Sequence, residues 1–242
     1  FAADHPANLR VPAVLTLPHH ASLLVQTDQQ GRDEAIAVLQ AVMARLLTSL
    51  PPGRVRFTII DPVGLGRNFA GFMHLADYQE ALVDSRIWTE AAHVEQRLND
   101  LTNHMENVIQ KYLRNEFESI DAYNRQAGEL AEPYRFLVVA DFPAGFNEEA
   151  ARRLSSIVSS GARCGVYTLI AHDIRQQPPI GVQVDDISAR SITLVRESGR
   201  FVWQDEVCRQ FPLTVDAPPA EATLTRLMHA VGNLARDANR MH

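Results

Sequence analysis

The sequence predicts a three-layer α/β fold in which a mostly parallel central sheet lies between two layers of helices. Two observations support this prediction. Short apolar runs bounded by Gly, Pro, Asn or Asp alternate with segments of helical periodicity, as in βαβ units. The runs are also nearly continuous in apolar residues, which is typical of parallel strands covered on both faces. The expected strands are residues 21–26, 55–60, 135–140 and 165–171.

Three amphipathic helices are expected between these strands. The first ends at Pro51-Pro52-Gly53, because proline cannot continue a helix. The second begins after Thr89, taken as its N-cap, and carries an apolar stripe as far as Tyr112. The third has Asn147 as its N-cap and ends at Gly161.

The pattern changes beyond the prolines at 178–179. Residues 191–195 and 200–203 predict a β-hairpin around a turn at 197–199. A last helix is expected over residues 220–237.

Composition and charge narrow the class of protein. With 242 residues, of which 46% are hydrophobic, the chain is long enough for a sizeable core. Its net charge of −6 gives no general attraction to nucleic acid, so any DNA contact needs a local basic patch. Cys164 and Cys208 form no disulfide framework, and no apolar run is long enough to span a membrane, so we expect a cytoplasmic location. The chain begins at Phe1, and we expect it to be a fragment of a longer protein.

Residues 22–34 carry the strongest functional signal. They have the strand, tight loop and helix start of a phosphate-binding loop, whose motif is GxxxxGK[ST]. Gly31 is retained, Arg32 stands in place of the lysine, and Asp33 replaces the hydroxyl residue that binds magnesium. A carboxylate about 6 Å from a phosphate costs roughly 3 kcal/mol at an effective dielectric near 20. The loop is therefore expected to keep its fold and to have lost its nucleotide, with Thr27, Gly31, Arg32 and Asp33 as the altered site. Alternatively, Asp33 and its acidic neighbour simply stabilise a helix N-terminus.

Residues 136–141 form an apolar strand that ends in Asp141. This is the form of a Walker B element, whose aspartate holds magnesium. The next residue should be the glutamate that acts as catalytic base, and here it is Phe142. Asp141 remains the candidate catalytic residue. The alternative is that it is an ordinary turn or cap residue at a strand end.

The order of these segments resembles the motor domain of the FtsK/SpoIIIE DNA translocase family, within the RecA-like P-loop ATPases. The resemblance spans roughly residues 12–179, from the loop at 23–34 through the turn at Asp61-Pro62 to the strand before His172. It implies a RecA-like P-loop NTPase architecture. We accordingly expect a degenerate FtsK/SpoIIIE-like P-loop ATPase domain at residues 1–182, with the hairpin and helix of residues 183–242 as an extension packing on the same domain.

The chain departs from the family pattern systematically. Val63 stands where a lysine follows Asp61-Pro62, and His172-Asp173 replaces a Thr-Gln sensor. The Walker A lysine and hydroxyl and the Walker B glutamate are also altered. The resemblance then implies a module that does not hydrolyse ATP and takes no cofactor itself, although active relatives use ATP and magnesium. It would act in assembly, in regulation, or in DNA or partner binding, beside neighbouring ATPase modules of the same polypeptide and in a homo-oligomeric ring.

Four arginines and one loop are the other candidates for contacts. Arg152, Arg153, Arg163 and Arg175 are expected along one edge of the sheet, where they would contact DNA or a neighbouring subunit, although a solvated helix face explains the first two equally well. Arg67, in the glycine-containing loop after Asp61-Pro62, is a candidate arginine finger for a neighbour. The histidines show no metal-ligand spacing, so no metal site is expected.

Two other functions remain open from the sequence. One is a substrate-binding module of a type VII secretion-like ATPase, which takes a peptide segment in the vacant crevice and predicts an exposed apolar patch near the loop. The other is a divergent but active ATPase in which Arg32 replaces the missing lysine.

Overall fold

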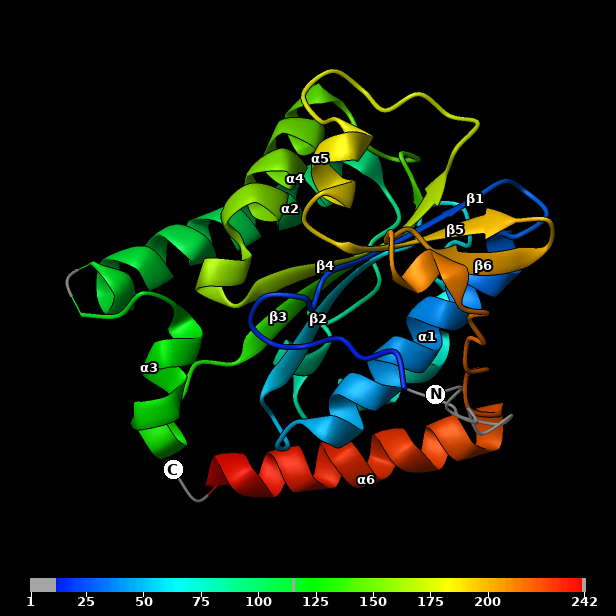
Figure 1. The fold of residues 1–242 in the computed structure, drawn as a ribbon. Helices are drawn as coiled ribbons and strands as arrows, with labels where there is room; N and C mark the ends of the chain where they lie inside the picture. Colours follow the sequence, from blue (N-terminus) through cyan, green and yellow to red (C-terminus); the bar gives the residue numbers. More distant parts are fainter. Residues whose placement is uncertain (1–11, 115, 241–242) are drawn as a thin grey trace, which may run out of the picture.

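The computed structural model describes residues 12–114 and 116–240. Its centre is a six-stranded sheet with the strand order β2-β3-β4-β1-β5-β6 (Figure 1). The strands are β1 (Leu23–Thr27), β2 (Val55–Ile60), β3 (Tyr134–Phe142), β4 (Val166–Asp173), β5 (Ile192–Glu197) and β6 (Arg200–Trp203). All neighbours pair in parallel except β5 and β6, which pair antiparallel. The predicted mostly parallel sheet is therefore confirmed.

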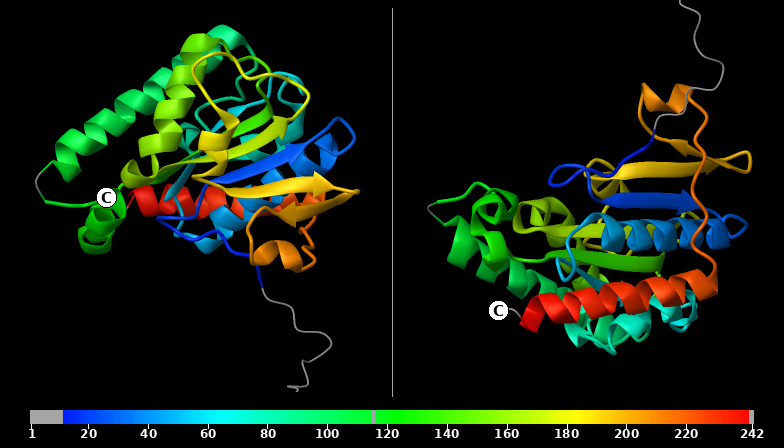
Figure 2. Two further views of the ribbon diagram at one scale, coloured as in Figure 1. Left: turned by 45° about the horizontal axis from the view of Figure 1, so that its top comes forward. Right: turned by 90° about the horizontal axis from the view of Figure 1, so that it is seen from below.

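Helices cover both faces of this sheet (Figures 1 and 2). One face is covered by α1 (Arg32–Ser49), the 3-10 helix η1 (Arg67–Leu75) and α6 (Glu221–Arg240). The other face is covered by α2 (Ala91–Val108) and α4 (Glu148–Ser160), with α3 (Ile120–Ala127) and α5 (Val184–Ser188) at its margins. These are the two helical layers of the predicted α/β/α fold.

Each face has its own apolar core, because successive strand residues point to opposite sides of a sheet. The first core combines alternate strand residues with α1, η1 and α6, and it includes Phe57, Phe136, Met43, Phe72 and Met228. The second combines the intervening strand residues with α2 and α4, and it includes Leu137, Val139, Ile170, Leu98 and Leu154. The continuous apolar runs of the strands are thus explained by burial on both faces.

The predicted hairpin is present, and it has a place in the sheet that the sequence did not indicate. β5 pairs in parallel with β1, so the hairpin extends the central sheet. Its turn residues Ser198 and Gly199 both have positive φ angles, 50° and 79°. This is the backbone of a two-residue turn that follows the twist of the strands.

Some local predictions were wrong. The N-cap of α2 is Glu90 rather than Thr89, and it caps through no side-chain hydrogen bond. The glycine-containing loop after Asp61-Pro62 is a turn as far as Gly66, and η1 begins at Arg67 and buries Phe69, Phe72 and Leu75. Asn147 does cap α4, because its side chain accepts a hydrogen bond from the N–H of Ala150 at 2.8 Å. No helix within the described ranges is long and apolar enough to cross a membrane.

Candidate functional site

The loop between β1 and α1 is held by a carboxylate of its own. Asp28 Oδ1 accepts hydrogen bonds from the backbone N–H groups of Gln30 and Gly31, both at 3.1 Å. In a phosphate-binding loop, successive N–H groups of this kind point at the anion. Here the N–H groups of Gln30 and Gly31 point at the Asp28 carboxylate of the same chain.

Gly31 is required by crowding rather than by its backbone conformation. A Cβ placed on Gly31 would lie 2.0 Å from Thr27 Oγ1 and 2.2 Å from Arg196 Cδ. Arg196 reaches over the loop from β5 and pairs with Glu34 of α1, with Nε 3.1 Å from Oε2. Arg196 therefore covers the loop, and it stayed unassigned in the sequence because only the pairing of β5 with β1 brings it there.

Asp141 reaches the loop through a β-bulge. The register between β3 and β4 shifts between Val139 and Phe142, so that Phe142 rather than Asp141 pairs opposite His172. Asp141 has a positive φ of 58°, which is uncommon for a residue other than glycine and is found where backbone geometry serves a site. The extra residue turns the Asp141 side chain towards α1.

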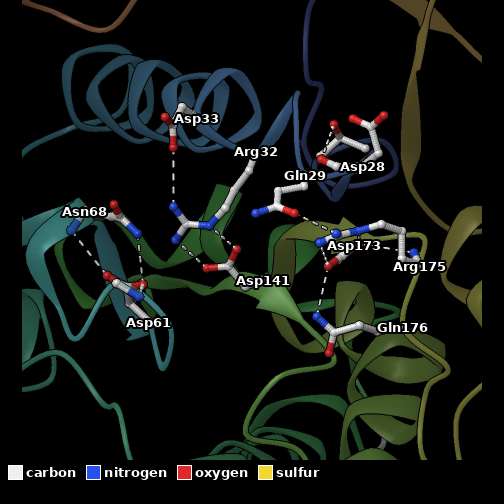
Figure 3. A network of polar contacts seen from close by, with 12 residues as sticks. Asp28, Gln29, Arg32, Asp33, Asp61, Asn68, Asp141, Asp173, Arg175 and Gln176 are labelled. Carbon is white, nitrogen blue, oxygen red and sulfur yellow. Dashed lines mark hydrogen bonds and ion pairs between the residues drawn. The ribbon is translucent and has the colours of Figure 1, made fainter.

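Arg32 and Asp141 form a two-pronged ion pair at the centre of the site (Figure 3). Nε lies 2.5 Å from Oδ1 and Nη2 lies 2.8 Å from Oδ2. The Asp141 side chain is 8% exposed and that of Arg32 is 28% exposed. The hydrogen bond from Arg32 to Asp141 raises the pKa of the guanidinium, against an opposing effect of burial. The two predicted site residues, one at the start of α1 and one at the end of β3, thus neutralise each other.

The carboxylates on either side of this pair also have partners within the chain. Asp61 is fully buried and accepts hydrogen bonds from the N–H of Gly64 at 3.0 Å and from the side chain of Asn68 at 3.0 Å (Figure 3). Asp173 is bound by Arg175, which holds the pKa of that carboxyl well below its usual range. Arg175 also donates to the side chain of Gln29 at 2.9 Å.

A small cavity remains between these groups, and we call its surroundings the loop crevice. It is bounded by the loop after β1 and the carboxyl ends of β3 and β4, and its lining residues include Thr27, Asp28, Arg32, Asp141, His172 and Asp173. Its volume of about 20 Å³ is about that needed for one water molecule. His172 is buried there without a hydrogen-bond partner for either ring nitrogen, and burial lowers its pKa.

Comparison with models of protein families shows the family of the chain. The model of the FtsK/SpoIIIE family matches residues 10–210. The chain belongs to the FtsK/SpoIIIE family. The match extends past residue 182, and the domain boundary placed there stays a prediction. A comparison with curated proteins finds no match.

Solved structures share the fold of this FtsK/SpoIIIE domain. ATPases 2 and 3 of EssC from Geobacillus thermodenitrificans have a TM-score of 0.60 at 12% identity, over 89% of this chain and 44% of theirs. ATPases 2 and 3 of Thermomonospora curvata EccC, in complex with a signal sequence peptide, have a TM-score of 0.61 at 17% identity, over 97% and 46%. The pCW3 conjugation coupling protein TcpA, in a monomer form with ATPgS, has a TM-score of 0.54 at 12% identity, over 81% and 52%. The chain spans about half the length of these matched chains, and the likeness establishes a RecA-like P-loop ATPase fold.

The surface arginines of the FtsK/SpoIIIE domain do not form the single edge that was predicted. Arg163 lies just before β4, whereas Arg175 lies just after it, at the opposite end of the strand. Arg152 pairs with Glu148 and Glu149 at 3.3 and 3.4 Å, and Arg153 pairs with Glu149 at 3.0 Å. Exposed pairs of this kind leave little net positive charge for a phosphate backbone.

The remaining predicted contact residue, Arg67, is exposed at the start of η1, and its Nε lies 3.4 Å from the carbonyl oxygen of Gly64. The role of Arg67 as an arginine finger for a neighbouring ATPase module stays a prediction. The described residues contain no group of three or more His, Cys, Asp or Glu side chains arranged to hold a metal ion.

Proposed function

We propose that this FtsK/SpoIIIE domain is a module that does not hydrolyse ATP, and that it acts in assembly or regulation beside ATPase modules of the same polypeptide. One observation carries the proposal. The groups that would meet a nucleotide are bonded to one another. Asp28 accepts hydrogen bonds from the loop N–H groups, and Arg32 forms an ion pair with Asp141.

The residues present do not suit ATP and magnesium. A triphosphate would have to displace the Asp28 carboxylate from the loop and separate Arg32 from Asp141. It would then lie near the exposed carboxylate of Asp33, whose repulsion disfavours an anion. Phe142 occupies the position of the expected catalytic base and carries no group that accepts a proton. No hydrolytic step is therefore assigned to this chain.

The arrangement of the matched proteins supports a role beside other modules. The chain covers 44% of the EssC chain and 46% of the EccC chain. Each of these two chains is described as containing two ATPases, numbers 2 and 3. Two of the matched structures are named as cytoplasmic domains, which agrees with the cytoplasmic location that we propose. Assembly in a ring remains a prediction of the family resemblance.

A second candidate function is the binding of a peptide segment near the loop crevice. Two loops that follow β2 and β4 expose apolar side chains, with Val63 52%, Leu65 70%, Ile174 56% and Ile180 74% exposed. Loops after parallel strands lie at the same edge of a sheet, where open α/β sheets bind ligands. The sequence predicted an apolar patch near the loop for this function, and the EccC structure is named as a complex with a signal sequence peptide. These features favour a protein partner over DNA.

Calorimetric titration with ATP and magnesium tests the main proposal. The wild-type chain should give no binding heat up to about millimolar nucleotide. Its Kd would then exceed about 1 mM, so its binding free energy would be weaker than about −4 kcal/mol. Micromolar binding that Arg32→Ala abolishes would instead establish a divergent working ATPase.

A loop variant makes the test sharper. Asp28→Ala frees the N–H groups of Gln30 and Gly31, so weak binding of nucleotide should become measurable. Asp205→Ala is the matched control, because Asp205 bonds the N–H groups of Val207 and Cys208 in the same way, after β6. If both variants behave like the wild type, the Asp28 carboxylate is not what closes the loop.

A further inference from the structure

A second cavity lies away from the loop crevice, and we call it the edge cavity. It has a volume of about 120 Å³ and lies between α2 and the strands β2 and β3, at the edge of the sheet that β2 forms. Figure 1 shows α2 above these two strands. Its lining residues include Arg56, Thr58, Asp84, Arg97, Asp100 and Arg135. The volume suits a small anion and is well below the several hundred Å³ of pockets for larger ligands.

Two arginines lie side by side on the sheet face of the edge cavity. Arg56 of β2 and Arg135 of β3 are partners in the parallel register. Neighbouring strands are about 4.8 Å apart, so two positive side chains start from adjacent positions on one face. Each has a buried Nε atom without a hydrogen-bond partner, and the structure records no ion pair for either within residues 12–114 and 116–240. Such an arrangement is unfavourable unless an anion is added.

The two aspartates that line the edge cavity form their ion pairs with Arg97, not with Arg56 or Arg135. Asp100 binds Arg97 at 2.7 Å, and Asp84 lies 3.7 Å from Arg97 and accepts a hydrogen bond from Thr58 at 3.4 Å. Three arginines against two aspartates leave the lining with one positive charge in excess. Glu132, outside the lining, acts on both Arg56 and Arg135, and Tyr112 donates to it at 3.5 Å.

Burial and neighbouring charges both act on the ionisation of the groups near the edge cavity. Burial lowers the pKa of Arg56, and burial followed by repulsion from Arg56 lowers the pKa of Arg135. The positive charges of both arginines also act on the ring of His104 in α2. Its pKa is lowered to about 4, first by burial and then by Arg135 and Arg56.

We propose that the edge cavity is a binding site for a phosphate group, held between the guanidinium groups of Arg56 and Arg135. A guanidinium presents N–H donors in a planar fork that matches the oxygens of phosphate, and charge-assisted hydrogen bonds to it are among the strongest in proteins. A phosphate dianion carries enough charge to neutralise both arginines, whereas a carboxylate neutralises one. The site lies on the α2 side of β2 and β3, and it does not depend on whether the loop crevice binds nucleotide.

Titration of the whole 242-residue chain with inorganic phosphate, followed by ³¹P NMR at constant ionic strength, tests this site. Binding should saturate. Arg56→Gln and Arg135→Gln should each weaken it about tenfold or more, because each removes a charge-assisted hydrogen bond. Arg152→Gln is the matched control, since that arginine is exposed on α4 and paired with glutamates, and it should bind phosphate like the wild type.

Two further variants and one second readout separate the outcomes. Arg135→Lys keeps the charge but loses the fork, so its affinity should lie between wild type and Arg135→Gln. Bound phosphate should also raise the pKa of His104 in ¹H NMR, a response that acetate at the same ionic strength should not match. Absence of saturable binding, equal binding in the double glutamine variant, or equal binding of acetate would overturn the proposal. So would loss of phosphate binding in Arg32→Ala alone, because that result would place the anion at the loop.

Discussion

The loop crevice and the edge cavity are both polar, and they differ in how their charges are satisfied. In the loop crevice, Arg32 is bound to Asp141 and the loop N–H groups are bound to Asp28. In the edge cavity, Arg56 and Arg135 keep buried Nε atoms without partners. The family resemblance directs attention to the first region, whereas two arginines with buried, unpartnered Nε atoms direct it to the second.

The two regions also affect their histidines differently. His172, in the loop crevice, has a pKa lowered by burial but raised by the negative charge of Asp173. His104, near the edge cavity, has a pKa lowered by burial and lowered further by Arg135 and Arg56. The charged neighbours of the two histidines therefore shift their pKa values in opposite directions.

The largest expected effect is the loss of stability when the crevice ion pair is broken. Arg32→Ala should lower the free energy of unfolding by about 3 kcal/mol, because it leaves the mostly buried Asp141 carboxylate without its partner. Urea unfolding measures this change. Asp33→Ala is the control, since Asp33 is 95% exposed and its contact with Arg32 should contribute less than about 0.5 kcal/mol. Equal effects of the two variants would show that the crevice pair is not satisfied as described.

A smaller effect is expected from the ionisation of His104. Its pKa is about 4 in the folded chain, against an ordinary value of 6.5, so folding favours the neutral ring. This contribution is complete above pH 6.5 and is lost as the pH falls towards 4. After allowance for partial exposure, we expect a loss of about 1–2 kcal/mol between these pH values. Urea unfolding of wild type and His104→Gln at pH 7 and 4.5 measures it, and identical pH dependence in both would contradict it.

The edge cavity should respond in the opposite sense to loss of an arginine. Arg135→Gln removes a partly buried charge whose folded-state pKa is lowered, so it should leave stability unchanged or raise it by up to about 1 kcal/mol. The unfolding midpoint in urea, without phosphate, measures this effect. A loss of stability comparable to that of Arg32→Ala would mean that Arg135 has a partner in the folded chain.

The smallest effect is expected from the surface arginines. The triple variant Arg152→Ala, Arg153→Ala, Arg163→Ala should change stability by less than about 1 kcal/mol, because its ion pairs are largely exposed. Binding of labelled DNA at low and moderate salt should be weak in the wild type and the same in the variant. A steep salt dependence that the variant removes would establish a DNA-binding face there.

Much of the fold and part of the site follow from local sequence. Apolar runs predicted β1 to β4, and the Ser198-Gly199 turn predicted the hairpin, because these signals act within a few residues. Thr27, Gly31, Arg32 and Asp141 lie close together in the structure, and their role as a nucleotide site stays a prediction. The prediction that Thr89 is the N-cap of α2 was wrong by one residue, because backbone geometry and packing decide among adjacent residues where a helix begins.

Other features required the tertiary structure. Arg196 reaches the loop only because β5 pairs beside β1, and Asp141 meets Arg32, 109 residues away, only because a bulge turns it out of β3. The sequence by itself determined the layers of the fold and which residues differ from the family motif, since both depend on the type and spacing of residues near one another. Only the tertiary structure decided which charges are neutralised and which are not. Ion pairing depends on distances of a few ångströms between strands that are far apart in the chain.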